Sequence, residues 1–492
     1  MSRNTWLARR ALMAIGLMVS FYVLALGVSF GLLWLAYFDL TRTRHPAWRL
    51  IAFCVVGAGS VLWAILPRRD RFEAPGSRVT PEDQPELFGM IGDIARATSQ
   101  AMPADVYLTN DVNAFVTQRD GFMGAGGRRV MGLGLPLMQA LTVDEFKGVL
   151  THEFGHYHAG DVALGPWIHK THSAMGRTIV QLSENVLRYI FIAFATLFLR
   201  VTYAVSRRQE FIADELAARV AGPDAMASAL RKVQGAGLAY QSYWYSEILP
   251  VVQAGFRPPV IDGFRRYASS PRVSSVFDLV GQQEEQAAGK ADPYDTHPSL
   301  AERVAALRTQ PPRPGSDSRP AVALLRNVEA CERELFSMLS ADLADLKPLD
   351  WSRVSDEVYL PMWRARLTQH GALLRRYNVA QPPATRQEIQ TIGQGILPKD
   401  ADEASREAVA WQLIVAAVVL ALRPAGWVAE TMPGDEVVLR RGADELRPYT
   451  ELAAVVAGRT PAADWQARCA RLGIGTIPLG VEPAAAEGAR NG

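Results

Sequence analysis

The sequence predicts a mainly α-helical protein with a small β-sheet, an N-terminal transmembrane helical hairpin and a mostly helical C-terminal domain. Three observations lead to this expectation. Two long uncharged stretches lie near the N-terminus, short strand-like segments follow them, and the remainder of the chain has mainly helical patterns. The 492 residues suffice for two or three domains, and a hydrophobic content of 49% is ample for their cores.

Composition excludes several classes of protein. A net charge of +2 gives no indication of a nucleic-acid partner. The three cysteines, Cys54, Cys331 and Cys469, are far apart and odd in number, so we expect neither a disulfide framework nor an oxidising compartment. The glycine-rich loop Gly121–Gly127 does not lead from a strand into a helix that begins with Lys-Ser or Lys-Thr. We therefore expect no nucleotide requirement.

The two uncharged stretches predict a membrane hairpin. Ala11–Phe38 has 28 residues and would be about 42 Å long as a helix, which exceeds the roughly 30 Å hydrocarbon core of a bilayer. The apolar region of a cleaved signal peptide is much shorter. Leu50–Leu66 has 17 residues, or about 25 Å, near the lower limit for a span. We expect residues 1–70 to form the hairpin, and the alternative is a signal anchor followed by a buried helix.

Arginines at the ends of these spans predict the orientation. Because basic residues favour the cytoplasmic side of a membrane, the side with more of them is expected inside the cell. Six arginines flank the outer ends of the hairpin and three lie in its loop, namely Arg3, Arg9, Arg10, Arg68, Arg69 and Arg71 outside it and Arg42, Arg44 and Arg49 within it. The N-terminus and the main body are therefore expected in the cytoplasm.

The segment after the hairpin predicts a helix and a small sheet. Residues 68–85 are polar and are interpreted as a linker, whereas apolar residues at helical spacing predict an amphipathic helix over 85–98. Residues 105–109 and 113–118 are strand-like and are separated by a turn, and 129–135 resumes strand-like sequence.

The motif Thr-His-Glu-Phe-Gly-His, which ends at His156, predicts a metal site. On a helix His152 and His156 share one face, so both can direct a nitrogen at one ion. Glu153 projects about 100° round the helix, where it can reach a metal-bound water. This is the H-E-x-x-H arrangement of zinc hydrolases, and its alternative is a helix with two ordinary surface histidines. Thr142 and Glu145 form a capping box that starts this helix, and Gly160 is the expected stop.

A third ligand has to come from farther along the chain. Ala159 and Val162 stand where the metzincin pattern requires Gly and His, so that class is excluded. A carboxylate is then needed, and Glu184 and Glu210 are the nearest candidates.

Glu210 lies in a predicted helix in which Asp214 falls on the same face one turn later. This spacing suits a ligand and an acid that accepts a hydrogen bond from a ligand imidazole. The alternative is a solvated charged face in which these acids pair with Arg207 and Arg208.

Three ordered motifs together resemble the HtpX-like family of membrane zinc metallopeptidases, which includes the eukaryotic CAAX prenyl proteases. They are the H-E-F-G-H run at 152–156, the Ser-Arg-x-x-Glu-x-x-Ala-Asp run at 206–214, and Thr-His-Pro-Ser-Leu-Ala-Glu-Arg at 296–303. Asn113-Ala114-Phe115 also resembles a strand that precedes the motif in this family. The resemblance covers roughly residues 80–305. It implies an α+β catalytic domain of the gluzincin type, expected over 71–310.

The resemblance also implies roles for individual residues. One Zn²⁺ per chain would be held by His152, His156 and Glu210, with Glu153 and His297 as catalytic residues and Asp214 as the partner of a ligand. His297 would lie near the substrate carbonyl, although it can also be read as a residue at the start of a helix. Asn113, Ala114 and Phe115 would form an edge strand that accepts the substrate backbone, as extended peptides do when they add to a sheet edge. Arg303 is interpreted as structural and paired with an acid.

The segment between the motif and Glu210 raises a question of topology. The apolar run Tyr189–Leu199 has 11 residues, about 16 Å of helix, and is too short to span. A single crossing would separate His156 from Glu210, and the residues up to 184 are too polar for a second one. We expect a helix near 186–205 that lies against or dips into the bilayer, or packs on the N-terminal hairpin. Many members of the resembled family have two crossings here.

The C-terminal third shows no chemistry, and its role is not readable from the sequence. Residues 311–320 are interpreted as a linker to a mostly helical domain over 321–492. The apolar run 408–422 favours a core helix over a membrane span. The expected elements are helices at 321–343, 351–376, 386–394 and 403–423 and a hairpin at 436–446.

These observations together predict a membrane-anchored zinc endopeptidase that acts in protein quality control. The alternatives are a processing protease of the CAAX type and a non-enzymatic membrane scaffold with a vestigial metal site. The expected partners are a membrane-associated polypeptide and the lipid bilayer, without nucleic acid or nucleotide. The resemblance implies a bacterial inner membrane, with the catalytic domain facing the cytoplasm.

Overall fold

A computed structural model describes the chain in two compact units. Unit 1 comprises residues 1–238 and 277–339, and unit 2 comprises 239–276 and 340–492. The residues described are 3–66, 72–119, 127–156, 165–182, 186–275, 298–313, 315, 317–339, 345–398 and 400–480.

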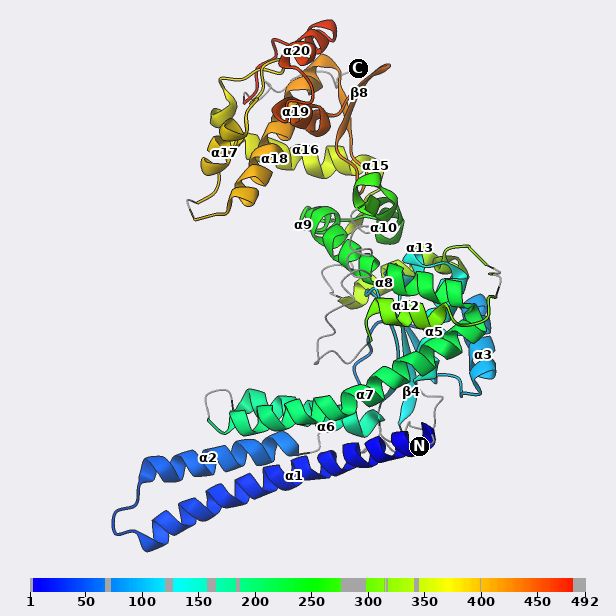
Figure 1. The fold of residues 1–492 in the computed structure, drawn as a ribbon. Helices are drawn as coiled ribbons and strands as arrows, with labels where there is room; N and C mark the ends of the chain where they lie inside the picture. The colour runs from blue at the N-terminus through cyan, green and yellow to red at the C-terminus, as the bar shows by residue number, and fades with distance from the viewer. Residues whose placement is uncertain are drawn as a thin grey trace. The chain divides into compact units, whose positions relative to one another are not determined.

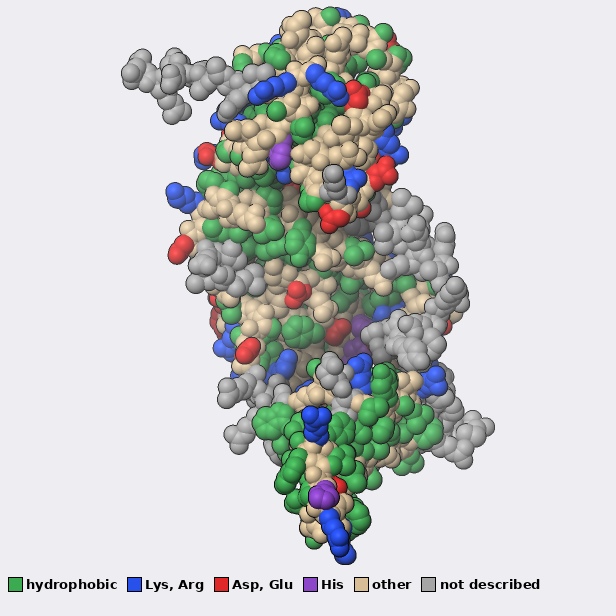
Figure 2. Space-filling model, turned by 90° about the vertical axis from the view of Figure 1, so that its left-hand side faces the viewer, with side chains coloured by type: hydrophobic (Ala, Val, Ile, Leu, Met, Phe, Trp, Pro, Cys, Tyr) green, Lys and Arg blue, Asp and Glu red, His purple; other side chains and the backbone are tan. Residues whose placement is uncertain are grey.

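Unit 1 begins with the predicted helical hairpin, formed by α1 (Arg3–Arg42) and α2 (Trp48–Ile65) (Figure 1). Within these helices Ile15–Arg42 and Trp48–Ile65 are long and apolar enough to cross a membrane. Many large hydrophobic side chains on both helices are exposed. Figure 2 shows these apolar side chains, in green, gathered on the surface of this part of the chain. Such a surface is suited to lipid.

A second pair of helices packs on this hairpin. It consists of α6 (Gly165–Gln181) and α7 (Arg188–Ala221), with α6 against α2 and α7 against α1. Phe21 on α1 is fully buried. Its ring centroid lies 6.3 Å from that of Phe191 and 6.2 Å from that of Phe194, both on α7. The helix expected near 186–205 therefore packs on the hairpin, which is one of the two arrangements that the sequence allowed. The polar stretch before it forms a helix of its own, and α6 and α7 together return the chain to the side of α5.

Unit 1 also contains a four-stranded sheet in the order β1-β2-β4-β3. Its strands are β1 (Ser77–Val79), β2 (Asp105–Thr109), β3 (Ala114–Arg119) and β4 (Arg128–Gly134). β2 runs parallel to β4, and β3 runs antiparallel to β4 at one edge. The last three strands match the predicted ones. Treating all of 68–85 as a linker was wrong, because β1 pairs with β2; three residues are too few to show a strand period.

The helix that carries the motif, α5 (Val143–Gly155), begins with the predicted capping box. Thr142 N–H donates to the Glu145 carboxylate, and Glu145 N–H donates to the Thr142 hydroxyl. Glu145 is 5% exposed and also accepts hydrogen bonds from Ser228 and Lys232 on α8 (Pro223–Tyr243). The helix ends at Gly155 with His156 as its C-cap, and the stop expected at Gly160 lies outside the described residues.

The remaining helices of unit 1 pack around α5, α7 and the four-stranded sheet. They are α3 (Pro85–Thr98), α4 (Leu135–Ala140), α12 (Leu300–Leu307), η3 (Ala321–Leu324) and α13 (Val328–Leu339). The segment expected as a linker at 311–320 is attached to the start of α5. The N–H groups of Val143 and Asp144 donate to the carbonyls of Arg319 and Asp317. The first N–H groups of a helix have no acceptor within the helix. Because the carbonyls of this segment accept two of them, the segment stabilises the start of α5.

Unit 2 combines short helices from two stretches of the chain. The first stretch contains η2 (Trp244–Ile248), α9 (Leu249–Gln253), β5 (Phe256–Arg257) and α10 (Val260–Ser269). The second begins with β6 (Lys347–Pro348), α15 (Trp351–Val354), η4 (Ser355–Tyr359), α16 (Leu360–His370), η5 (Gly371–Leu374) and α17 (Arg386–Gln394). It continues with α18 (Glu403–Leu422), η6 (Arg423–Ala425), β7 (Val428–Glu430), β8 (Val438–Arg441), β9 (Asp444–Leu446), α19 (Pro448–Val456) and α20 (Ala462–Arg471).

Helix α18 is the centre of the core of unit 2. By length and composition Glu403–Ala425 is a third candidate membrane span. Its side chains nevertheless pack among other elements of unit 2, with Leu413, Val419 and Leu422 fully buried. This packing favours the core helix that the sequence predicts.

The boundaries of the two compact units differ from the predicted domain boundaries. Residues 321–339 remain with unit 1, and 239–276 join unit 2. The division into 1–70, 71–310 and 321–492 therefore stays a prediction about domains. The helices expected at 386–394 and 403–423 and the 436–446 hairpin agree with the structure, and 351–374 is a series of helical segments. The single helix expected over 321–343 was wrong, because η3 and α13 are separate helices there.

Candidate metal centre

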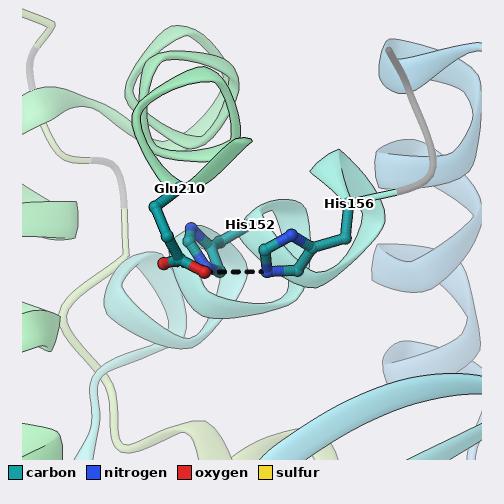
Figure 3. A group of neighbouring side chains, drawn as sticks. All are labelled: His152, His156 and Glu210. Atoms are coloured by element: carbon teal, nitrogen blue, oxygen red, sulfur yellow. Dashed lines mark ion pairs between the residues drawn. The ribbon is translucent and has the colours of Figure 1, made fainter. Parts of the chain in front are cut away.

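Three donors from two helices converge in unit 1 (Figure 3). His152 and His156 come from α5 and its C-cap, and Glu210 comes from α7. Their ligand atoms all lie within 4.8 Å of one another. His152 Nε2 is 3.5 Å from Glu210 Oε2, and His156 Nε2 is 3.7 Å from Glu210 Oε1. The structure thus brings together the three residues that were expected to bind a metal.

The spacing of these donors fits a metal ion better than direct hydrogen bonds. A hydrogen bond from an imidazole nitrogen to a carboxylate would span about 2.7–3.2 Å. Two ligands that are each about 2.0–2.1 Å from a tetrahedral ion are separated by about 3.3–3.4 Å. The observed 3.5 and 3.7 Å are close to this second value. Two imidazoles and one carboxylate are also a donor set that zinc prefers.

The glycine inside the motif permits the close approach of α5 and α7. A Cβ atom added to Gly155 would lie 2.8 Å from Ala213 Cα and 2.9 Å from Ala213 Cβ. Real Cβ atoms do not come that close to a backbone atom, so a larger residue would separate the two helices. Ala213 lies between Glu210 and Asp214 on α7. Gly155 therefore sets the distance at which the ligands from the two helices meet.

Asp214 holds the ring of His152. Its Oδ1 lies 2.9 Å from His152 Nδ1, which therefore donates and leaves Nε2 to face Glu210. Arg303 binds the same carboxylate with two nitrogens, Nη2 at 2.6 Å from Oδ1 and Nε at 2.8 Å from Oδ2. Burial alone would raise the pKa of Asp214, but hydrogen bonds from Arg303 and His152 outweigh it and hold the pKa at about 2.

The residue expected to be only structural, Arg303, reaches this centre from α12. Its partner acid is Asp214, and its Nη1 is also 3.4 Å from Glu210 Oε2. Arg207, the expected alternative partner of the α7 acids, pairs with Glu302 on α12. Sequence reasoning missed the position of Arg303 because the pairing joins residues 89 positions apart. The signal available was its place at the end of the third motif.

Glu153 is a residue of α5, and its carboxylate lies against the edge strand β3. Burial raises the pKa of its carboxyl to about 7, and the negative charge of Glu210 adds to this effect while His152 and Arg303 oppose it. The backbone N–H of Val116 on β3 donates a hydrogen bond to it. Glu153 is therefore beside the donor group and also in contact with the strand expected to bind substrate.

The outer edge of β3 directs backbone groups toward the side on which Glu153 lies. Among the described residues no strand pairs with the outer edge of β3. The carbonyl of Asn113 accepts from Gly134 N–H at 2.9 Å, so Asn113 faces β4, whereas Val116 faces Glu153. Because backbone groups alternate in direction along a strand, Ala114 faces outward with Val116. Phe115 faces β4 with its backbone, and its ring lies over Gly132, where a Cβ would come within 2.3 Å of it.

Two expected candidates cannot be located. His297 and Glu184 lie outside the described residues.

The class of protein follows from this arrangement. An H-E-x-x-H helix with a glutamate from a second helix is typical of zinc metallopeptidases that keep an open metal position. Comparison with known proteins agrees. Residues 81–310 match the model of peptidase family M48. This part, just under half of the chain, is similar to that family and to the HtpX-like membrane metallopeptidases.

Individual relatives cover part of the chain. A Protease HtpX homolog of Thermococcus kodakarensis is 28% identical over 184 residues, 32% of this chain and 60% of that protein. A Protease HtpX homolog of Methylibium petroleiphilum is 26% identical over 254 residues, 48% of this chain and 78% of that protein. Protease HtpX of Idiomarina loihiensis is 26% identical over 212 residues, 38% of this chain and 71% of that protein. The chain thus spans about three fifths of the first relative's length. No solved structure matches.

Proposed function

We propose that the protein is a membrane-anchored zinc endopeptidase that cleaves membrane-associated polypeptides. The observation that carries this proposal is the convergence of His152, His156 and Glu210 beside the carboxylate of Glu153. The M48 match and the apolar α1–α2 hairpin give further support. A purely structural zinc site has four protein ligands, whereas the described residues offer three.

The residues of the centre suggest how it would act. A zinc ion held by His152, His156 and Glu210 would polarise the scissile carbonyl and bind the attacking water in a more acidic form. Glu153 would take a proton from that water and pass it to the leaving amine, as a general base and then acid. The N–H of Val116 on β3 holds the Glu153 carboxylate toward the edge strand, where it would face a substrate bound there. His297 is proposed to help at the substrate carbonyl.

The edge of β3 would hold the substrate as an added strand. Asn113, Ala114 and Phe115 precede the point where Val116 N–H meets Glu153. An extended peptide that bonds to the outward groups of Ala114 would therefore run past Glu153. Recognition through the backbone tolerates many sequences, which suits an enzyme that removes misfolded proteins. We therefore propose a role in protein quality control, at a bacterial inner membrane with the site on the cytoplasmic side.

The proposal is tested with full-length protein in detergent or liposomes. Wild type should bind one zinc per chain and cleave an unfolded substrate such as casein, and a chelator should stop the cleavage. Glu153→Gln should retain zinc but cleave at least about 10²-fold more slowly, because the proton acceptor is lost. Glu215→Gln is the matched control, since Glu215 is an exposed acid on α7 that pairs with Arg219.

Each other result has a definite meaning. Equal cleavage by Glu153→Gln and wild type would contradict the mechanism. Bound zinc without any cleavage would favour the membrane scaffold, and cleavage restricted to prenylated C-terminal peptides would favour the CAAX-type protease.

A further inference from the structure

We propose that Arg303 is a positioning residue of the metal centre: it holds Asp214 in the orientation that keeps His152 Nε2 facing the ion, and it balances the charge of the two α7 carboxylates. This inference rests on the proposed zinc site. It concerns the environment of the ligands rather than the ligands themselves.

The contacts of Arg303 are directed at the ligand system. Its guanidinium binds both oxygens of Asp214, at 2.6 and 2.8 Å. Its Nη1 is 3.4 Å from Glu210 Oε2, and its Nη2 is 3.4 Å from His152 Nδ1. One side chain therefore touches a ligand imidazole, a ligand carboxylate and the acid that orients the imidazole. Paired contact with both oxygens fixes the plane of the Asp214 carboxylate, which a single hydrogen bond would leave free to rotate.

The burial of the charged Arg303 and Asp214 side chains costs free energy of folding, which suggests a functional role for the pair. The side chains of Arg303 and Asp214 are 13% and 2% exposed. Charges withdrawn from water are expensive, and apolar residues of similar size often stabilise a fold as well or better. A buried arginine between two carboxylates is thus poorly explained by stability alone. Its guanidinium lies 3.4 Å from Glu210 Oε2 and 2.6 Å from Asp214 Oδ1, so it contacts both carboxylates.

The orientation of His152 depends on this arrangement. The imidazole can bind an ion through Nε2 only if its proton stays on Nδ1. Asp214 Oδ1 fixes that proton by accepting the Nδ1 hydrogen bond at 2.9 Å. If Arg303 were absent, the Asp214 carboxylate could turn, and His152 would lose its fixed orientation. Outer partners of this kind are typically worth 10–100-fold in metal affinity.

The docking of α12 does not depend on Arg303 alone. Leu300, Val304 and Leu307 of α12 are buried in a cluster with residues of α7 and α8. A capping box formed by Ser299 and Glu302 starts the helix. An Arg303 variant should therefore fold with α12 in place, so that any loss at the metal centre reflects positioning.

The chain offers a matched control in a second ion pair between the same two helices. Arg207 of α7 pairs with Glu302 of α12, which is not a proposed ligand. Arg207→Met should weaken α12 docking without changing the metal centre. A merely structural role predicts similar effects for Arg207→Met and Arg303→Met, whereas a positioning role predicts different ones.

The experiment measures zinc affinity by competition with a chromophoric chelator in the full-length protein. Co²⁺ absorption reports the coordination geometry, and melting temperature reports folding. We expect Arg303→Met to bind zinc about 10–100-fold more weakly and to alter the Co²⁺ spectrum. Arg303→Lys keeps the charge but cannot contact both oxygens, so its loss should lie at the lower end of that range. Arg207→Met should match wild type in affinity and spectrum.

The outcomes separate the two proposals. Wild-type affinity in Arg303→Met and Arg303→Lys, or an equal loss in Arg207→Met, would overturn the role of Arg303 while leaving the zinc site intact. If wild type itself binds no zinc, the proposed function fails instead. If Arg303→Met does not fold, Arg303→Lys decides, and an unchanged affinity in that variant overturns the inference.

Discussion

The two units of the protein differ in what they bury. Among the described residues of unit 1 the buried charged or titratable polar ones are Asp105, Glu145, His152, Glu210, Asp214 and Glu332, and four of these six lie on α5 or α7. Among the described residues of unit 2 the buried polar ones are Ser270 and Ser355, Glu247 is partly buried, and the core around α18 is apolar. Because burying charge is costly, its concentration in one unit indicates where function has shaped the fold. The core of unit 2 has the apolar composition expected where side chains serve packing alone.

The largest effect on stability is expected in the apolar core of unit 2. Leu413→Ala removes a fully buried side chain from α18 and should lower the free energy of unfolding of unit 2 by about 2–5 kcal/mol. Hydrogen–deuterium exchange should rise in α18 and its neighbours, whereas zinc affinity should be unchanged. Val415→Ala, at a partly buried position of the same helix, is the control and should cost less. Loss of zinc binding in Leu413→Ala would show that the two units do not differ as described.

The next effect is expected where α5 meets α7. Gly155→Ala should cost about 1–3 kcal/mol by overpacking and should also abolish tight zinc binding, because a Cβ cannot fit against Ala213. Zinc affinity and melting temperature measure the two consequences. Gly176→Ala on α6 is the control, since no atom lies within 4 Å of its added Cβ. That variant should be neutral or slightly stabilised, and an equal loss in both variants would contradict the assigned role of Gly155.

The sequence predicted local features better than distant contacts. The capping box at Thr142, the strands after 105 and the helix of the motif were correctly expected, because each is encoded within a few neighbouring residues. His152 and His156 were also expected, because the H-E-x-x-H spacing is local, whereas Glu210 was one of two candidate carboxylates and was assigned through the family resemblance. The pairing of Gly155 with Ala213 joins residues 58 positions apart and has no local signature.

Where prediction failed, long-range pairing decided the structure. β1 exists because Ser77–Val79 pairs with β2, not because its three residues favour a strand. The segment 311–320 has a linker composition, yet its carbonyls satisfy the start of α5. Arg303 was expected to pair with an acid, and its partner Asp214 lies 89 positions earlier in the chain. In each case the partner lies far away in the sequence, and composition alone does not identify it.

One buried glutamate in unit 1 should make stability rise with pH. Burial opposes ionisation of Glu145, but hydrogen bonds from Lys232, Ser228 and Thr142 outweigh it and lower the pKa of its carboxyl. The unfolded chain then binds the proton more tightly, so the stabilisation is present above about pH 4.5 and is lost as pH falls through the folded-state pKa. Glu145→Gln should cost about 1–3 kcal/mol at pH 7, mainly by leaving Lys232 without its carboxylate, and less at pH 4. Urea unfolding at both pH values measures this, and an equal cost at both would contradict it.

The smallest effect, with the opposite sign in pH, is expected from a glutamate in unit 2. Burial raises the pKa of Glu247, and the nearby Asp435 raises it further, although hydrogen bonds from Gly434 N–H and the Tyr359 hydroxyl and the charge of Arg272 oppose the shift. The folded state therefore holds the proton more tightly, and wild-type stability should fall as pH rises from about 4.5 through the folded-state pKa.

Glu247→Gln removes this dependence while keeping an oxygen that can accept both hydrogen bonds. At pH 7 the free energy of unfolding of the variant should differ from that of wild type by less than about 1 kcal/mol. The stability of the variant relative to wild type should increase as pH rises. Unfolding curves of Glu247→Gln and Glu145→Gln over the same pH range give two slopes of opposite sign. If both substitutions cost the same at neutral pH, Glu247 would be a paired charge like Glu145. Unit 2 would then carry buried ionic chemistry of its own, and the contrast between the units would no longer hold.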